Sequence, residues 1–207
     1  DLLGNNQEPV SLKIRGIKIK SEREIDLMRK AGQIVVTVLT EIKELVKPGM
    51  TTLDVDRYVE NRVLELGAEP SFKEQQGFPA STCVNINEEV EHAIPKSQKV
   101  INNGDLLKVV VGASVDGYHC KSTISICIGA PSEIAKKIST VAKDALDAGL
   151  SKIKPGNTLL DVAGAIEDIV KANGFTVVED YTGHGIGQNL MEEPWLVSRN
   201  TFEQRRR

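Results

Sequence analysis

A nine-residue phrase occurs twice in this 207-residue sequence and indicates how the chain is organised. It reads Lys47-Pro48-Gly49-Met50-Thr51-Thr52-Leu53-Asp54-Val55 in the first copy and Lys154-Pro155-Gly156-Asn157-Thr158-Leu159-Leu160-Asp161-Val162 in the second. Seven of the nine positions are identical, and the second copy follows the first by 107 residues. Gly67 and Gly174 keep the same offset. Two copies so far apart favour a duplicated half-domain over a solenoid repeat, and chance recurrence of a common helix-turn-helix phrase is the weaker alternative.

Each copy of the phrase separates two predicted helices. A Pro-Gly pair ends a helix, so we expect helices over 21–46 and 52–66 in the first half and over 132–153 and 159–172 in the second. Ser21 followed by Glu24 is a capping box at the first of these helices, which also carries an apolar stripe. A short strand over 175–179 is expected after Gly174.

The middle of the chain predicts a β-hairpin. Apolar runs over 106–112 and 118–128 flank Asp116-Gly117, a dipeptide typical of a two-residue turn. That turn places Val110 opposite Thr123, and makes residue 121 the diagonal neighbour of residue 110 on the same face, about 7–8 Å away. Two carboxylates at such positions would suit a pair of metal ions, but Val110 and Lys121 stand there.

Composition excludes some classes of function. The net charge is −3 and the pI is about 5.7, so the basic surface of a nucleic-acid-binding protein is not expected. No apolar run approaches the roughly 20 residues of a membrane span. The 3 cysteines form no C-x-x-C motif, which predicts reduced thiols inside a cell. We expect a cytoplasmic protein, or one of an organelle stroma or matrix if a targeting segment before Asp1 has been removed.

Three histidines are candidates for chemistry. His184 lies in Gly183-His184-Gly185-Ile186-Gly187, where flanking glycines allow close approach; it is either a metal-binding or catalytic residue or a turn histidine. His92 follows several acidic residues, which raise its basicity if they converge on it and otherwise form a solvated loop. His119 and Cys120 are adjacent in a strand and face opposite sides, so they form no dyad.

Longer motifs show a resemblance to the type I methionine aminopeptidases over about residues 14–197. The segments that carry it are Ile17-Lys18-Ile19-Lys20-Ser21-Glu22-Arg23-Glu24-Ile25, Met28-Arg29-Lys30-Ala31-Gly32, Gly77-Phe78-Pro79-Ala80-Ser81-Thr82-Cys83-Val84-Asn85-Ile86-Asn87-Glu88, His92-Ala93-Ile94-Pro95, Gly104-Asp105-Leu106-Leu107-Lys108-Val109, Asp116-Gly117-Tyr118-His119, Gly183-His184-Gly185-Ile186-Gly187 and Glu192-Glu193-Pro194.

The resemblance implies an α+β pita-bread fold, in which two pseudo-symmetric halves surround a curved, mostly antiparallel sheet with helices on its outer face. We therefore expect an irregular N-terminal extension over 1–16 and an incomplete pita-bread domain over 17–207. Its repeat halves would cover about 21–130 and 131–207, with the C-terminal part missing. An incomplete sheet would leave an open edge, through which the chain would self-associate.

The family removes the initiator methionine from new proteins with two divalent metal ions, Co, Mn, Fe or Zn, held by two Asp, one His and two Glu. His184 matches the His ligand, whereas Val110 and Lys121 occupy the two Asp positions. Cys120 replaces the Gly before the second Asp, and Met191 replaces a second histidine. Both Glu ligands belong to a C-terminal stretch that this sequence lacks. Since Lys121 would repel a cation 4 Å away by about 4 kcal/mol, we expect this chain to bind no metal.

The substrate side of the family's site is better matched. His92 corresponds to a histidine that contacts the substrate, and with His184 it is a candidate catalytic residue. Cys83 and Phe78 match positions that line the methionine pocket, while Gln75 stands where an aromatic residue is usual. The expected partner is a peptide or a nascent protein N-terminus.

Three functions follow from these matches. The first is an inactive relative, a pseudoenzyme that still holds a protein N-terminus. The second is an active metal-dependent methionyl aminopeptidase whose C-terminal residues are absent from this sequence and whose Asp residues are replaced by other groups. The third is a non-catalytic docking module.

Overall fold

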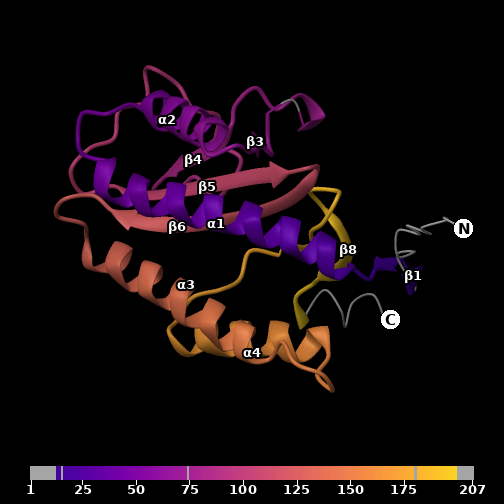
Figure 1. Cartoon of the computed structure of the whole chain (residues 1–207). Helices are drawn as coiled ribbons and strands as arrows, with labels where there is room; N and C mark the ends of the chain where they lie inside the picture. Colours follow the sequence, from indigo (N-terminus) through magenta and orange to yellow (C-terminus); the bar gives the residue numbers. More distant parts are fainter. Residues whose placement is uncertain (1–12, 15, 74, 180, 200–207) are drawn as a thin grey trace, which may run out of the picture.

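The computed structural model describes residues 13, 14, 16–73, 75–179 and 181–199. The predicted helices are present with slightly shorter bounds: α1 Glu22–Leu45, α2 Thr52–Glu65, α3 Glu133–Ser151 and α4 Leu159–Ala172. In Figure 1, α1 and α2 lie on one side of a central β-sheet and the α3–α4 pair lies beyond strand β6 on the other side.

The repeated phrase forms the same local structure twice. Thr51 caps α2 by accepting a hydrogen bond from the Asp54 backbone N–H, and Thr158 caps α4 in the same way through Asp161. Both are full capping boxes, because each aspartate carboxylate also accepts from the backbone of its threonine. The glycine of each Pro-Gly pair has φ of 93°, a left-handed conformation that favours glycine. The two copies of the phrase therefore share a local structure as well as a sequence.

The central sheet is built on the predicted hairpin. Strand β5 Leu106–Val115 pairs antiparallel with β6 Tyr118–Cys127, and Val110 lies opposite Thr123, as predicted. Asp116 and Gly117 have φ of 49° and 77°, which a two-residue hairpin turn of this hand requires. The other edge of β5 pairs with β4 Thr82–Ile86 and with the short β3 Glu69–Pro70.

The remaining short elements lie at the periphery. They are β1 Lys13–Ile14, which pairs with β2 Ile17–Lys18; the 3-10 turn η1 Gln75–Gly77; and β7 Gly183–Gly185, which pairs with β8 Glu192–Leu196. Most of the predicted N-terminal extension, residues 1–12 and 15, lies outside the described residues.

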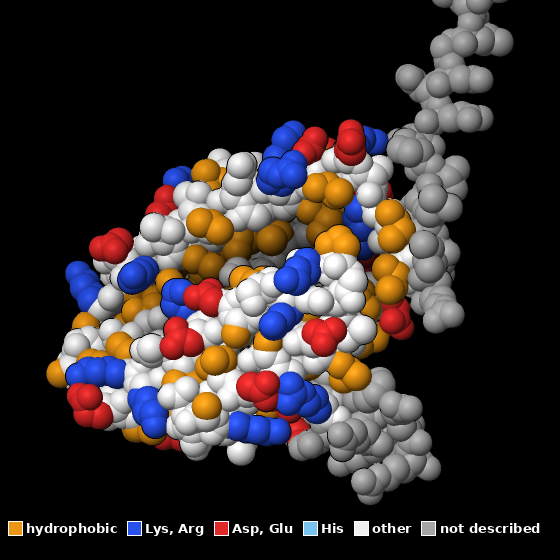
Figure 2. Space-filling model, turned by 90° about the horizontal axis from the view of Figure 1, so that it is seen from below, with side chains coloured by type: hydrophobic (Ala, Val, Ile, Leu, Met, Phe, Trp, Pro, Cys, Tyr) orange, Lys and Arg blue, Asp and Glu red, His pale blue; other side chains and the backbone are white. Residues whose placement is uncertain are grey.

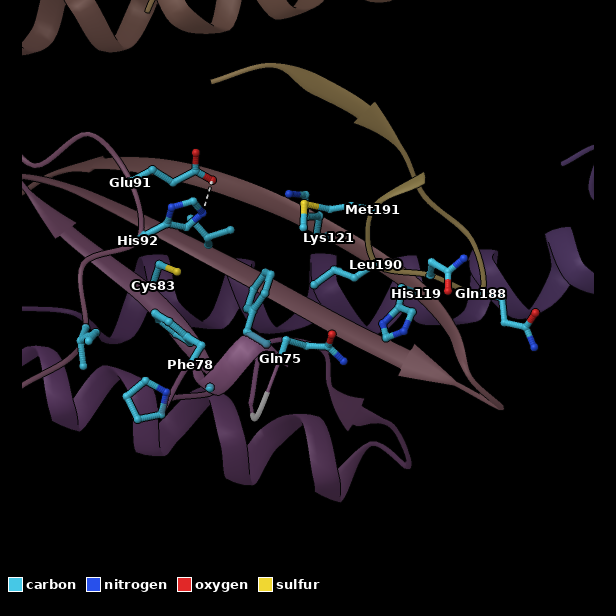
Figure 3. Close-up of a pocket in the computed structure, with 16 residues that line it drawn as sticks. Gln75, Phe78, Cys83, Glu91, His92, His119, Lys121, Gln188, Leu190 and Met191 are labelled. Atoms are coloured by element: carbon cyan, nitrogen blue, oxygen red, sulfur yellow. Dashed lines mark ion pairs between the residues drawn. The ribbon is translucent and has the colours of Figure 1, made fainter. Parts of the chain in front are cut away.

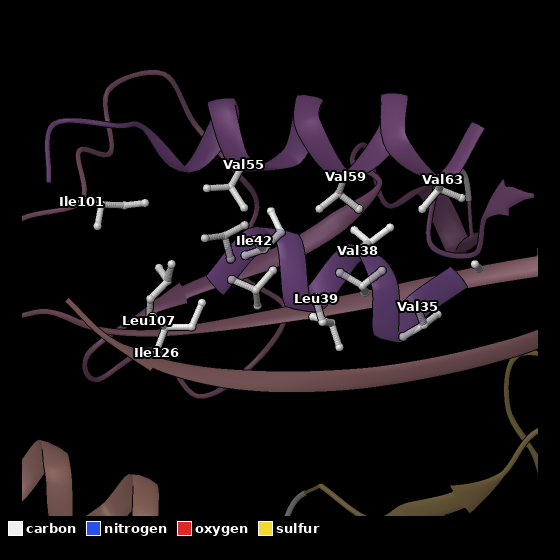
Figure 4. Packing of buried hydrophobic residues seen from close by; sticks show 14 of the residues in the cluster. Val35, Val38, Leu39, Ile42, Val55, Val59, Val63, Ile101, Leu107 and Ile126 are labelled. Carbon is white, nitrogen blue, oxygen red and sulfur yellow. The ribbon is translucent and has the colours of Figure 1, made fainter. Parts of the chain in front are cut away.

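The hydrophobic core lies between the sheet and helices α1 and α2 (Figure 4). Strand side chains alternate between faces, so Leu107, Val109 and Val111 of β5 enter this core. Val110 consequently faces the opposite side of the sheet. The fully buried core side chains from the two helices are Val35, Val38, Ile42, Val55, Val59 and Val63. Burying each of these stabilises the fold by about 1.5–3 kcal/mol relative to exposure.

One strand prediction is wrong, and one strand of the central sheet was missed. The strand expected over 175–179 does not form, and β4 was not predicted. The first half pairs its corresponding segment, β3, with β5. Among the described residues, the second half offers segment 175–179 no such hairpin, and a strand without a partner leaves its backbone groups unpaired.

Within the described part of the chain, strand β6 forms an open edge of the sheet. There β6 pairs only with β5, apart from a backbone hydrogen bond of 2.8 Å from the His119 N–H to the Gly187 carbonyl. Figure 2 shows a hollow bordered by hydrophobic side chains on the face of the molecule seen from below. Self-association through this edge stays a prediction. None of the described helices is long and apolar enough to cross a membrane.

Candidate functional site

A cavity of about 600 Å³ lies against the face of the sheet that points away from the core. Loops after β3 and β4 and the segment between β7 and β8 form its other walls (Figure 3). It brings together most of the residues predicted for the site: Phe78, Cys83, His92, Val110, Lys121, Gln75 and Met191. Residues distant in sequence thus converge on one pocket.

The strand register sets the back wall of the cavity. Cys83 of β4 lies opposite Val110 of β5, and Val110 lies opposite Thr123 of β6. Lys121 is two residues from Thr123, so its side chain shares a face with Val110. Burial raises the pKa of the Cys83 thiol to about 11, and Glu91 adds to this while Lys121 opposes it. Cys83 is therefore a neutral, apolar part of the wall.

His92 is placed by the loop that follows β4. This histidine has φ of 59°, a left-handed conformation that is uncommon outside glycine. The buried Asn85 side chain anchors the loop, because its Oδ1 accepts a hydrogen bond of 2.9 Å from the Ala93 N–H. The His92 side chain is 63% exposed, packs edge-on against Tyr181 and lies 3.9 Å from the Glu91 carboxylate. It is free to contact a ligand.

Asp56 of α2 supports the start of β4 and was not recognised in the sequence. One carboxylate oxygen accepts hydrogen bonds of 2.9 Å from both the Ser81 and the Thr82 N–H. Burial raises the pKa of Asp56, while these two bonds oppose the rise. A buried carboxylate that satisfies two backbone donors holds the chain in place immediately before Cys83.

His119 also lines the cavity, although the sequence provided no argument for a role. Its Nδ1 lies 2.9 Å from the Ser71 hydroxyl, and burial lowers its pKa. Cys120 faces the other way, toward Gly32 of α1, where a Cβ would lie 3.4 Å from its sulfur. The prediction that His119 and Cys120 form no dyad is confirmed by this alternation.

His184 is not brought into this cavity. It lines a separate cavity with Pro155, Leu159 and Pro194, its Nδ1 lies 2.7 Å from the Gly185 carbonyl, and its ring tilts against Trp195. The catalytic and metal roles predicted for His184 stay predictions. The glycine-rich segment borders the main cavity instead through its continuation, Gln188–Met191.

The donor set does not fit a pair of divalent metal ions. Val110 offers no ligand atom, and Lys121 adds a positive charge on the same face. Among the described residues, no group of three or more His, Cys, Asp or Glu side chains is arranged to hold a metal ion. Such ions require carboxylate and imidazole ligands, so the described lining of this cavity supports no metal-dependent step.

Comparisons with known proteins identify the family. The model of metallopeptidase family M24 matches residues 26–206. A methionine aminopeptidase of Clostridium acetobutylicum is 43% identical over 178 residues, which cover 86% of this chain and 71% of that protein. Methionine aminopeptidase 1 of Bacillus subtilis is 41% identical over 177 residues and is covered to 71%.

The fold agrees with this relationship. The crystal structure of methionine aminopeptidase from Thermotoga maritima superposes with a TM-score of 0.86 at 37% identity, covering 87% of this chain and 73% of that one. The predicted pita-bread fold is thereby confirmed. The family uses divalent metal and acts on peptide or protein N-termini. The chain belongs to metallopeptidase family M24, among its type I methionine aminopeptidases.

Proposed function

We propose that this chain binds the N-terminal residue of a peptide without hydrolysing it, as a pseudoenzyme of the methionine aminopeptidase family. The observation that carries the proposal is the shared face of Val110 and Lys121 within a cavity that retains Phe78, Cys83 and His92. The residues expected to hold a substrate side chain are present, while the positions expected to hold metal carry a neutral and a cationic side chain.

The cavity has the chemistry of a binding site for an apolar side chain. Phe72, Phe78, Leu190 and Met191 surround it together with the neutral Cys83 thiol. Sulfur and aromatic groups interact favourably, so a methionine side chain is a suitable occupant. A cavity of about 600 Å³ is within the range of small-ligand pockets.

Hydrolysis of a peptide bond is not expected in this cavity. Without a metal, the pKa of water stays near 16 rather than about 7, and no hydroxide forms at neutral pH. The Lys121 ammonium disfavours a divalent cation beside Val110. We therefore assign binding and not peptide hydrolysis to this cavity.

The test measures turnover and binding on the same chain. A short Met-Ala peptide should release no methionine above the metal-free control when Mn²⁺ or Co²⁺ is added, while the Bacillus subtilis relative serves as the positive control. Calorimetry should show that the peptide binds. Val110→Phe should abolish binding by filling the cavity, whereas Val36→Phe, which makes the same substitution at an exposed position of α1 outside the cavity, should not. Metal-dependent methionine release would overturn the proposal in favour of an active enzyme.

A further inference from the structure

The cavity contains two opposite charges that do not neutralise each other. Glu91 and Lys121 both line it, yet no ion pair within 4.0 Å joins them, and the Glu91 carboxylate instead lies 3.9 Å from the His92 ring. Lys121 is partly buried, and among the described residues its side-chain ammonium has no hydrogen bond or ion pair. A partly buried ammonium without a counter-ion is unfavourable unless a ligand supplies one.

The two charges lie in different parts of the cavity. Figure 3 shows Glu91 and His92 at one end, His119 and Gln188 at the other, and Lys121 between them. Glu91 comes from the loop after β4 and Lys121 from β6, so separate elements hold the charges apart. Both act on the Cys83 thiol, where Glu91 raises the pKa and Lys121 lowers it. Cys83 therefore marks a point within electrostatic reach of both groups.

An apolar surface connects the charged groups. Cys83 and Val110 form the back wall beside Lys121, and Phe78 lies on the side of Cys83 (Figure 3). A matching ligand carries a cation and an anion on neighbouring atoms together with an apolar side chain. This is the chemistry of an apolar α-amino acid.

We propose that the cavity binds a free apolar α-amino acid such as methionine, with its ammonium toward Glu91 and its carboxylate toward Lys121. The proposal rests on the proposed function, since it concerns the same cavity, and it names the ligand class. A carboxylate satisfies Lys121 better than the carbonyl of a peptide bond, because hydrogen bonds between two charged groups are about twice as strong as neutral ones. The reverse orientation would bring like charges together at both ends.

The experiment compares three ligands on the unmodified full chain by isothermal titration calorimetry. L-methionine carries both charges, L-methioninamide lacks the carboxylate, and N-acetyl-L-methionine lacks the ammonium. Methionine should bind about tenfold tighter than either analogue. Equal affinities for methionine and methioninamide would overturn the amino-acid assignment but leave the proposed function intact. Binding of none of the three ligands, and none of the Met-Ala peptide, would overturn both.

Two charge-neutralising variants assign the contacts. Lys121→Gln should remove the difference between methionine and methioninamide, and Glu91→Gln should remove the difference between methionine and N-acetyl-methionine. Lys143→Gln is the matched control, because it removes one positive charge from an exposed position on α3 and should change neither difference. If Lys121→Gln retains the preference of the wild-type chain for methionine, Lys121 does not recognise the carboxylate and the proposal is wrong.

Discussion

Val110 and Lys121 share one face of the β5–β6 hairpin, and both line the same cavity. The pairing of Val110 with Thr123 places Lys121 on the diagonal, a separation of about 7–8 Å between backbone positions. The resemblance to the methionine aminopeptidases predicts two metal-binding aspartates at these positions. On that prediction, the hairpin keeps the geometry of the site while Val110 and Lys121 supply no carboxylate.

The first prediction concerns metal binding. Excess Mn²⁺ should leave the unfolding midpoint of the wild-type chain unchanged, because a neutral and a cationic side chain replace two carboxylates. The double variant Val110→Asp/Lys121→Asp should show a higher midpoint with Mn²⁺ than without it. A ligand at 100 times its Kd adds about 2.7 kcal/mol to the free energy of unfolding, which a thermal scan resolves.

A second double variant controls for added charge alone. Val36→Asp/Lys143→Asp makes the same two kinds of substitution at exposed positions of α1 and α3 outside the cavity, and it should give no metal-dependent change. A clear rise for the wild-type chain would contradict the prediction, since it would require a metal site built from other residues, and the active-enzyme hypothesis would then be favoured.

The second prediction concerns Asp56 and pH. Asp56→Ala leaves the Ser81 and Thr82 N–H groups without their acceptor and should lower the free energy of unfolding by about 1–3 kcal/mol. Asp56→Asn retains an acceptor oxygen and should cost much less. Chemical denaturation at neutral pH compares the two variants, and equal losses would show that the hydrogen bonds to Ser81 and Thr82 are unimportant.

The difference in stability between the wild-type chain and Asp56→Asn should change with pH in one direction. Burial raises the folded-state pKa of Asp56 above its unfolded value, so the folded chain takes up the proton first as the pH falls. The wild-type chain should therefore gain stability relative to Asp56→Asn as the pH falls through the folded pKa. The difference should level off below the unfolded pKa, and a relative loss of wild-type stability over this interval would contradict the raised pKa.

The third prediction concerns the close contact of Gly112 with the cavity wall. A Cβ at Gly112 would lie 2.9 Å from the Ser71 Cβ and 3.0 Å from the Phe72 Cζ, so one of these groups must move. Gly112→Ala should destabilise the chain by about 1–3 kcal/mol and weaken ligand binding by displacing Phe72.

Gly32→Ala is the matched control for that substitution. Its Cβ would be 3.4 Å from the Cys120 sulfur, an ordinary contact, and alanine is favoured over glycine within a helix by up to about 1 kcal/mol. Urea denaturation should show stabilisation for Gly32→Ala and destabilisation for Gly112→Ala. Similar effects at both glycines would show that the contact with Phe72 is not restrictive.

Features that depend on neighbouring residues could be predicted from the sequence. The capping boxes at Ser21, Thr51 and Thr158, the helix ends and the Asp116-Gly117 turn each depend on a few consecutive residues. The shared face of Val110 and Lys121 followed from the two-residue period of a strand once the turn was located. The family followed from motifs spread over most of the chain.

Features that depend on distant residues were decided by the tertiary structure. Asp56 and Asn85 are ordinary polar residues in the sequence, and only packing places them beside the backbone groups that they satisfy. The separation of His184 from His92, and the opposite charges of Glu91 and Lys121 in one cavity, depend on how loops cross the sheet. The sequence by itself therefore determined the repeat, the helices and the hairpin, because local hydrogen bonds specify them. Only the folded chain decided which side chains meet, because those contacts join residues that are far apart in the sequence.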